Sequence, residues 1–164
     1  MKILPQSLLL LTALLLSSCI FKEPVFRQGF TPAPKSWPGV WTTDGTDPRT
    51  GEYALLAPLN DGSYLLTQPA NSAGAFYYQC THLRIRGRHL LQLQVLASFK
   101  GGLPKGGVGS WTLVWVTPLL DGRLSVRPLT SEGKTYAECR ALLTSSGSDW
   151  NKLFGKPTIY RKLP

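Results

Sequence analysis

Beyond residue 39, apolar and polar residues alternate with a period of two along most of the chain, as in β-strands separated by tight turns. The alternation is clearest in residues 89–99. There Leu91, Leu93, Val95 and Ala97 occupy one face, and Gln92 and Gln94 occupy the other. In the same way Trp111, Leu113 and Trp115 share a face of a later strand. The pattern predicts strands at 40–43, 52–59, 63–68, 75–85, 89–99, 111–119, 123–129 and 158–162.

Turn signals separate these segments. Asn60-Asp61-Gly62, Arg86-Gly87-Arg88 and Asp121-Gly122 each predict a hairpin. Residues 100–110 hold five glycines and one proline, which indicates a flexible loop.

The period changes once, near residue 135. Thr135 and Glu138 have the spacing of a capping box, and Tyr136, Cys139 and Leu143 follow at i, i+3 and i+7 along one helical face. One more helical turn is expected at 150–154. Successive hairpins with a late helix predict a mainly β protein: an antiparallel meander forming a small barrel or a strongly curled sheet, with one C-terminal helix. An open antiparallel sheet wrapped on the helix is the alternative.

The segment Gly39-Val40-Trp41 stands at the start of the first predicted strand, where Trp41 is expected to face inward. In this tripeptide and in its strand order, the chain resembles the lipocalin-like (calycin) barrels, in which a Gly-x-Trp packs at the base of the barrel. The resemblance implies a small barrel with Trp41 packed at its base.

The first 18 residues have the character of a signal peptide. Lys2 is followed by a leucine-rich run, which is short for a membrane span. The tetrad Leu16-Ser17-Ser18-Cys19 resembles a bacterial lipobox. That resemblance implies cleavage before Cys19, lipidation of its sulfur and attachment to a membrane of the cell envelope. The residue after Cys19 is Ile20 and not Asp. By resemblance to enterobacterial lipoprotein sorting, this favours the periplasmic side of the outer membrane over the inner membrane.

Residues 19–38 are rich in proline and lack periodic apolar positions, so they are expected to form an extended tether. The predicted organisation is therefore a signal peptide (1–18), a lipidated tether (19–38) and a β-rich domain (39–164).

Two cysteines remain in the domain, Cys80 and Cys139. In an oxidising compartment they would be able to form a disulfide, and two buried, unreactive thiols are the alternative. Cys80, His82 and His89 would make a partial metal site, but no fourth ligand is evident, so no metal is expected.

The chain has 18 basic and 9 acidic residues, a formal net charge of +9. Its densest basic feature is the hairpin carrying Arg84, Arg86 and Arg88, a candidate anion-binding site. A solvated hairpin end that discourages edge pairing would have the same composition.

No nucleophile elbow, phosphate loop or paired-histidine metal motif is present, so we expect neither enzymatic activity nor a cofactor. Five tryptophans would fill the core or line a cavity. Three functions fit: binding of an amphipathic or anionic ligand, docking on an envelope protein or cell-wall polymer, and inhibition of lysozyme. The basic charge disfavours lysozyme inhibition, since lysozymes are basic as well. The expected partners are a membrane, a lipid, a glycan or an envelope protein, and not nucleic acid.

Overall fold

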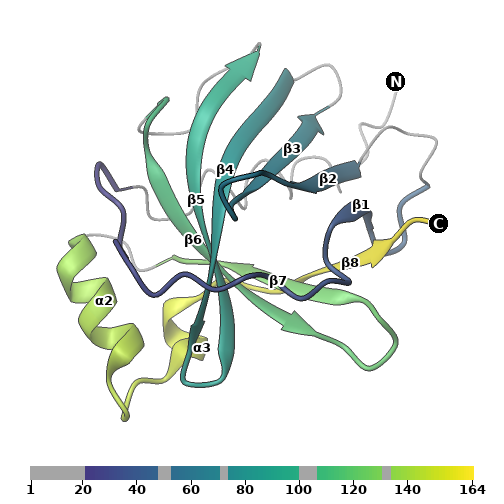
Figure 1. The fold of residues 1–164 in the computed structure, drawn as a ribbon. Helices are drawn as coiled ribbons and strands as arrows, with labels where there is room; N and C mark the ends of the chain where they lie inside the picture. The colour runs from purple at the N-terminus through teal and green to yellow at the C-terminus, as the bar shows by residue number, and fades with distance from the viewer. Residues whose placement is uncertain (1–20, 48–52, 71–73, 100–106, 131–133) are drawn as a thin grey trace, which may run out of the picture.

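The chain folds into a closed antiparallel barrel of eight strands (Figure 1). A computed structural model describes residues 21–47, 53–70, 74–99, 107–130 and 134–164, so residues 1–20, with the lipobox and Cys19, and residues 100–106 lie outside it. The strands are β1 (Gly39–Thr43), β2 (Tyr53–Pro58), β3 (Tyr64–Ala70), β4 (Gly74–Ile85), β5 (Arg88–Phe99), β6 (Trp111–Pro118), β7 (Leu124–Pro128) and β8 (Thr158–Lys162). Each strand pairs with the next, and β8 pairs with β1. The mainly β prediction is confirmed, in its closed-barrel form.

The two ends of the barrel differ in their connections. At one end, which we call the turn end, short turns join β2 to β3, β4 to β5 and β6 to β7. The β4–β5 turn has positive φ at both Arg86 (52°) and Gly87 (77°), the conformation of a two-residue hairpin that matches the strand twist. At the other end, the loop end, the strands lead into residues 44–52, 71–73, 100–110 and 129–157.

An irregularity in the β4–β5 pairing corrects the alternation expected in β5. Tyr78 lies opposite Val95, but Tyr77 lies opposite Ala97, so Leu96 is an extra residue. Leu96 is 42% exposed. The bulge turns Ala97 to the face opposite that of Val95, because one extra residue reverses every later side chain. The predicted common face therefore ends at Val95.

Two separate cores stabilise the barrel. The inner core fills the barrel with buried side chains, including Trp41, Leu56, Tyr78, Cys80, Leu91, Leu93, Val114 and Val116. The outer core lies on the outside of β4, β5 and β6. Its buried members include Phe21, Val25, Leu83, Leu90, Leu113, Cys139, Leu143 and Trp150. The strands between the two cores are thus buried on both faces.

The N-terminal strap (residues 21–37) provides one part of this outer cover. Phe21 and Trp111 exchange two backbone hydrogen bonds of 2.8 Å. The Gln92 side chain accepts from the Phe26 N–H (2.8 Å) and donates to the Phe26 carbonyl (3.0 Å). The side-chain amide thus satisfies both backbone polar groups of Phe26, as a neighbouring β-strand would. The Thr31 N–H donates to the His82 carbonyl (2.9 Å), and the Ala33 N–H donates to Tyr64 Oη (2.9 Å).

These contacts correct the expectation of a tether in this segment. Residues 21–37 have few regular elements, as their prolines predict, but they are bound along the barrel and do not hold it at a distance. The reason is that Phe21, Val25, Phe26 and Trp37 bury apolar side chains against the barrel wall.

Two helices provide the rest of the outer cover, and they lie together beside the barrel (Figure 1). In α2 (Tyr136–Thr144) the capping box of Thr135 and Glu138 is confirmed, and Cys139 and Leu143 are buried. Tyr136 is 38% exposed, so the predicted apolar face begins only at Cys139. The short α3 (Trp150–Leu153) buries Trp150. Neither described helix has the length and apolarity needed to cross a membrane.

The Gly39-Val40-Trp41 segment has a clear steric requirement. Gly39 has φ of +140°, and a Cβ there would lie 2.5 Å from Lys162 Cε. The Lys162 ammonium lies 5.9 Å from the Trp41 ring centroid and donates to the Ser36 carbonyl (2.9 Å). Glycine therefore lets the last strand pass close enough for Lys162 to cover the inward-facing Trp41.

We predict that Gly39→Ala lowers the free energy of unfolding by about 1–3 kcal/mol, because the substitution adds backbone strain and displaces Lys162. Urea denaturation followed by tryptophan fluorescence measures the change. Gly147→Ala is the control, since a Cβ at Gly147 meets nothing within 4 Å, and it should stay within about 0.5 kcal/mol of the parent protein. Equal stability of both variants would contradict the prediction.

Candidate binding site

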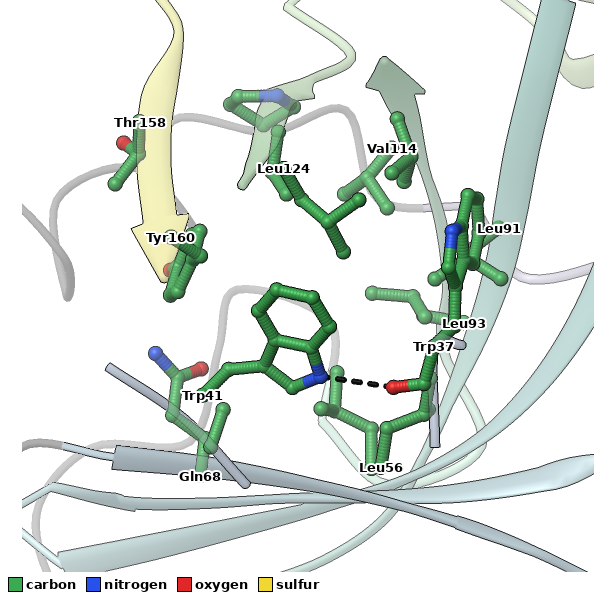
Figure 2. A pocket seen from close by; sticks show the side chains of 15 residues that line it. Trp37, Trp41, Leu56, Gln68, Leu91, Leu93, Val114, Leu124, Thr158 and Tyr160 are labelled. Atoms are coloured by element: carbon green, nitrogen blue, oxygen red, sulfur yellow. Dashed lines mark hydrogen bonds between the residues drawn. The ribbon is translucent and has the colours of Figure 1, made fainter. Parts of the chain in front are cut away.

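An apolar cavity of about 120 Å³ lies inside the barrel (Figure 2). Among the described residues, its walls come from the strap and from every strand except β4. The lining residues are Trp37, Trp41, Ala54, Leu56, Leu66, Gln68, Leu91, Leu93, Val114, Val116, Leu124, Val126, Pro128, Thr158 and Tyr160. A buried apolar cavity of roughly this size, about 150 Å³, is large enough to bind benzene.

Two tryptophans close the turn end of the cavity. Trp37 belongs to the strap and is 2% exposed, and its carbonyl accepts a 2.8 Å hydrogen bond from Trp41 Nε1. This bond satisfies the one polar atom of the Trp41 ring, so the indole presents only hydrocarbon to the cavity. Trp41 was predicted to face inward, and the structure confirms it. The other tryptophans divide differently, because Trp111, Trp115 and Trp150 belong to the outer core or pack against it.

Polar groups gather on one side of the cavity. Figure 2 shows Gln68, Thr158 and Tyr160 on the side facing away from Leu91, Leu93 and Val114. No charged residue is among the described residues that line the cavity. Desolvation inside the barrel raises the pKa of Tyr160 above its usual value, so this phenol stays neutral.

Gln68 and Tyr160 were not singled out in the sequence. A signal for Gln68 was nevertheless present, because Tyr64, Leu66 and Gln68 have the period-two spacing of one strand face. An amide on an otherwise apolar face indicates either an exposed position or a polar group placed inside. At 8% exposure, Gln68 is inside.

A histidine pair lies beneath the cavity, against Trp37. His82 Nδ1 is 3.0 Å from the Thr31 carbonyl oxygen, which can only accept, so Nδ1 carries a proton. His82 Nε2 then accepts from His89 Nδ1 at 2.9 Å. The Trp37 ring centroid lies 5.5 Å from that of His82 and 5.2 Å from that of His89. The pair thus joins the barrel wall to the strap at the point where the strap turns inward.

The thiols do not form the predicted bridge. Cys80 belongs to the inner core and Cys139 to the outer core, with the barrel wall between them, and no disulfide joins them. Burial raises the pKa of the Cys80 thiol, so it remains protonated and unreactive. Both ring nitrogens of His82 bond to protein atoms, and no group of three or more metal-ligating side chains occurs among the described residues.

The three arginines of the β4–β5 hairpin separate into different roles. Arg84 is exposed. Arg86 donates to the carbonyls of Ser145 and Ser146 (2.8 Å for Ser146), at the end of α2. The Arg88 guanidinium carbon lies 4.8 Å from the Trp150 ring centroid and 5.3 Å from that of Trp115, within cation–π range. Two of the three charges are therefore engaged within the fold, and anion binding by this hairpin stays a prediction.

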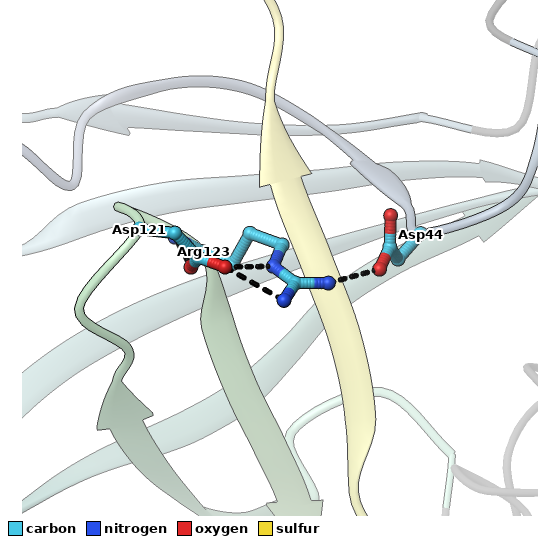
Figure 3. Close-up of polar contacts among 3 residues, drawn as sticks. All are labelled: Asp44, Asp121 and Arg123. Atoms are coloured by element: carbon cyan, nitrogen blue, oxygen red, sulfur yellow. Dashed lines mark hydrogen bonds and ion pairs between the residues drawn. The ribbon is translucent and has the colours of Figure 1, made fainter.

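A further arginine fastens the short-stranded side of the barrel. Arg123 reaches across β8 and forms ion pairs with Asp121 (2.6 Å) and Asp44 (Figure 3). Hydrogen bonds from Arg123 hold the pKa of the Asp121 carboxyl below its usual value. These groups are partly exposed, so the network contributes little stability, but it fixes β7 relative to β1 where the strands are only five residues long.

Comparison of the chain with protein-family models, with curated proteins and with solved structures found no match. Function is therefore inferred from the geometry and chemistry of the barrel itself.

We predict that the protein loses stability as the pH falls from 7.5 to 5.5. Burial, aided by the charge of Arg84, lowers the pKa of both His82 and His89 below 6.5. The unfolded chain then binds more protons than the native state below pH 6.5, so acid favours unfolding. Two added protons would also place two N–H donors 2.9 Å apart.

Urea midpoints measured at intervals across this pH range test the prediction. The double variant His82→Gln and His89→Gln removes both titrations, so its midpoint should change less with pH than that of the parent protein. An equally steep decline in both proteins would assign the pH dependence to other groups.

Proposed function

We propose that this chain is the precursor of a lipid-anchored lipoprotein of the bacterial cell envelope, whose lipocalin-like barrel binds a small, largely apolar ligand and catalyses no reaction. The observation that supports the binding function is the apolar cavity inside the closed barrel. The anchoring rests on the sequence, in which Leu16-Ser17-Ser18-Cys19 resembles a lipobox.

The cavity supports a ligand that is compact. Its volume of about 120 Å³ is well below the range of about 300–1,000 Å³ that is usual for drug-sized ligands. A single ring, or the end of one hydrocarbon chain, matches it better than a whole lipid. The lining leucines, valines and tryptophans would stabilise such a group by about 25 cal/mol for each Å² of apolar surface removed from water.

The lipocalin-like assignment has structural support at the base of the barrel. The resemblance places a Gly-x-Trp there, and Gly39 and Trp41 lie at the turn end, with Lys162 over the indole ring. The strand order supports it too, since all eight strands pair in sequence and β8 returns to β1.

Lipidation at Cys19 would hold the barrel close to the membrane. Phe21 is fixed to Trp111, the first residue of β6, which lies at the loop end. Two residues span at most about 7 Å, so the lipidated sulfur would remain near the loop end and no spacer would separate the two. Hydrophobic molecules in the bilayer would then reach the barrel over a short distance.

Ligand binding is tested by titrating residues 20–164, which contain every strand and both cores, with methylcyclohexane. We predict a saturable shift of the Trp41 indole N–H resonance, because Trp41 lines the cavity, with no shift for Trp150 outside the barrel. Ala54→Leu narrows the cavity and should weaken binding at least tenfold. Absence of any Trp41 response in the folded protein would overturn the binding function.

Anchoring is tested in bacteria that express the full chain with radiolabelled palmitate. The parent chain should incorporate the label and sediment with membranes, and Cys19→Ser should abolish both. Cys139→Ala, which leaves the lipobox intact, should keep the label. Labelling of Cys19→Ser would refute the anchor.

A further inference from the structure

Gln68 is one of three polar residues that line the cavity, with Thr158 and Tyr160. It lies on β3, next to Thr67, which pairs with Leu55 of β2, and it is 8% exposed. Its amide offers two donors and one acceptor. Among the cavity-lining side chains of Figure 2, the one marked hydrogen bond joins Trp41 to Trp37, so none of them satisfies the Gln68 amide.

A second polar group, the Tyr78 hydroxyl, belongs to the inner core. Tyr78 of β4 lies two residue pairs along the sheet from Gln68, since Gln68 pairs with Phe76 and Leu66 pairs with Tyr78. Tyr78 is 1% exposed, and its hydroxyl has no hydrogen-bond partner in the described structure. A buried polar atom without a partner costs about 1–3 kcal/mol, so this side of the barrel has hydrogen-bonding capacity that its own residues leave unused.

The uncharged lining of the cavity limits which polar groups of a ligand can bind there. None of the described lining residues is charged. Lys162, at the turn end, is not among them, and its ammonium donates to the Ser36 carbonyl. A carboxylate or ammonium group would lose its hydration on entry and gain no opposite charge in return. A hydroxyl or carbonyl group would lose much less and would regain a hydrogen bond from the amide.

We infer that Gln68 determines which ligand the barrel accepts: a neutral molecule that carries one hydroxyl or carbonyl group on a compact hydrocarbon body. The polar atom of the ligand bonds to the Gln68 amide, and the hydrocarbon lies against Leu91, Leu93 and Val114. This assignment rests on the proposed binding function and adds the chemical class of the ligand. It also excludes anionic molecules as ligands of the cavity.

Three probes of similar size distinguish the possibilities: cyclohexanol, methylcyclohexane and cyclohexanecarboxylate. Dissociation constants are measured at pH 7.5 from the Trp41 indole resonance of residues 20–164. We expect Gln68→Leu to weaken the binding of cyclohexanol at least tenfold and to leave methylcyclohexane unchanged or bound more tightly. Cyclohexanecarboxylate should not bind either protein. Gln94→Leu is the matched control, because Gln94 lies on the outer face of β5 and should change neither constant.

The outcomes separate this assignment from the binding function itself. If Gln68→Leu binds cyclohexanol and methylcyclohexane as the parent protein does, the barrel binds hydrocarbon and Gln68 has no part in selection. If the carboxylate binds as well as the alcohol, the preference for neutral ligands is wrong. If the folded parent protein binds no probe, the binding function fails together with this inference. Near-ultraviolet circular dichroism confirms that each variant keeps its packed aromatic core.

Discussion

Burial of the outer face of β4, β5 and β6 is the constraint on which the other features of the molecule depend. Leu83, Leu90 and Leu113 point away from the barrel interior, yet they are at most 2% exposed. Each would lose about 1.5–3 kcal/mol if it were left in water. A bare eight-stranded barrel of this sequence would therefore expose a broad apolar surface. The strap and the two helices remove that surface from water, so they are integral parts of the fold.

The strap connects this outer cover to the cavity. It is held through the Gln92 side chain and through His82, and a few residues later it places Trp37 across the turn end of the barrel. The strap is consequently one continuous segment that covers part of the outer face and also contributes Trp37 to the cavity wall. Protonation of the histidine pair or loss of the Gln92 bonds would act on both, because Trp37 contacts both imidazole rings.

Several arginine and aromatic side chains form contacts that stabilise the fold. Arg86 holds the end of α2, Arg88 lies between two indole rings, and Arg123 fastens the short strands. The net charge of +9 thus includes several cations that are already engaged within the molecule. Among the described residues, the cavity lining by contrast carries only neutral polar groups, namely Gln68, Thr158 and Tyr160 (Figure 2). Binding in the proposed site would consequently depend on the shape of the cavity and on hydrogen bonds to its neutral polar groups more than on the net charge of the protein.

The sequence by itself determined the strands, the hairpins and the capped helix, because these follow from local periodicity and turn chemistry. The alternation of Leu91 and Leu93 with Gln92 and the capping box of Thr135 act within a few residues of the chain. Long-range contacts decided the rest. A proline-rich segment has the same composition whether it is solvated or bound, and only the apolar outer face of β4–β6 makes residues 21–37 a strap. Likewise, the sequence does not tell whether Cys80 and Cys139 are close enough to pair. In the closed barrel they belong to different cores, with the barrel wall between them. Which side of a strand is enclosed depends on residues far along the chain, and this is why the cavity emerged only from the tertiary structure.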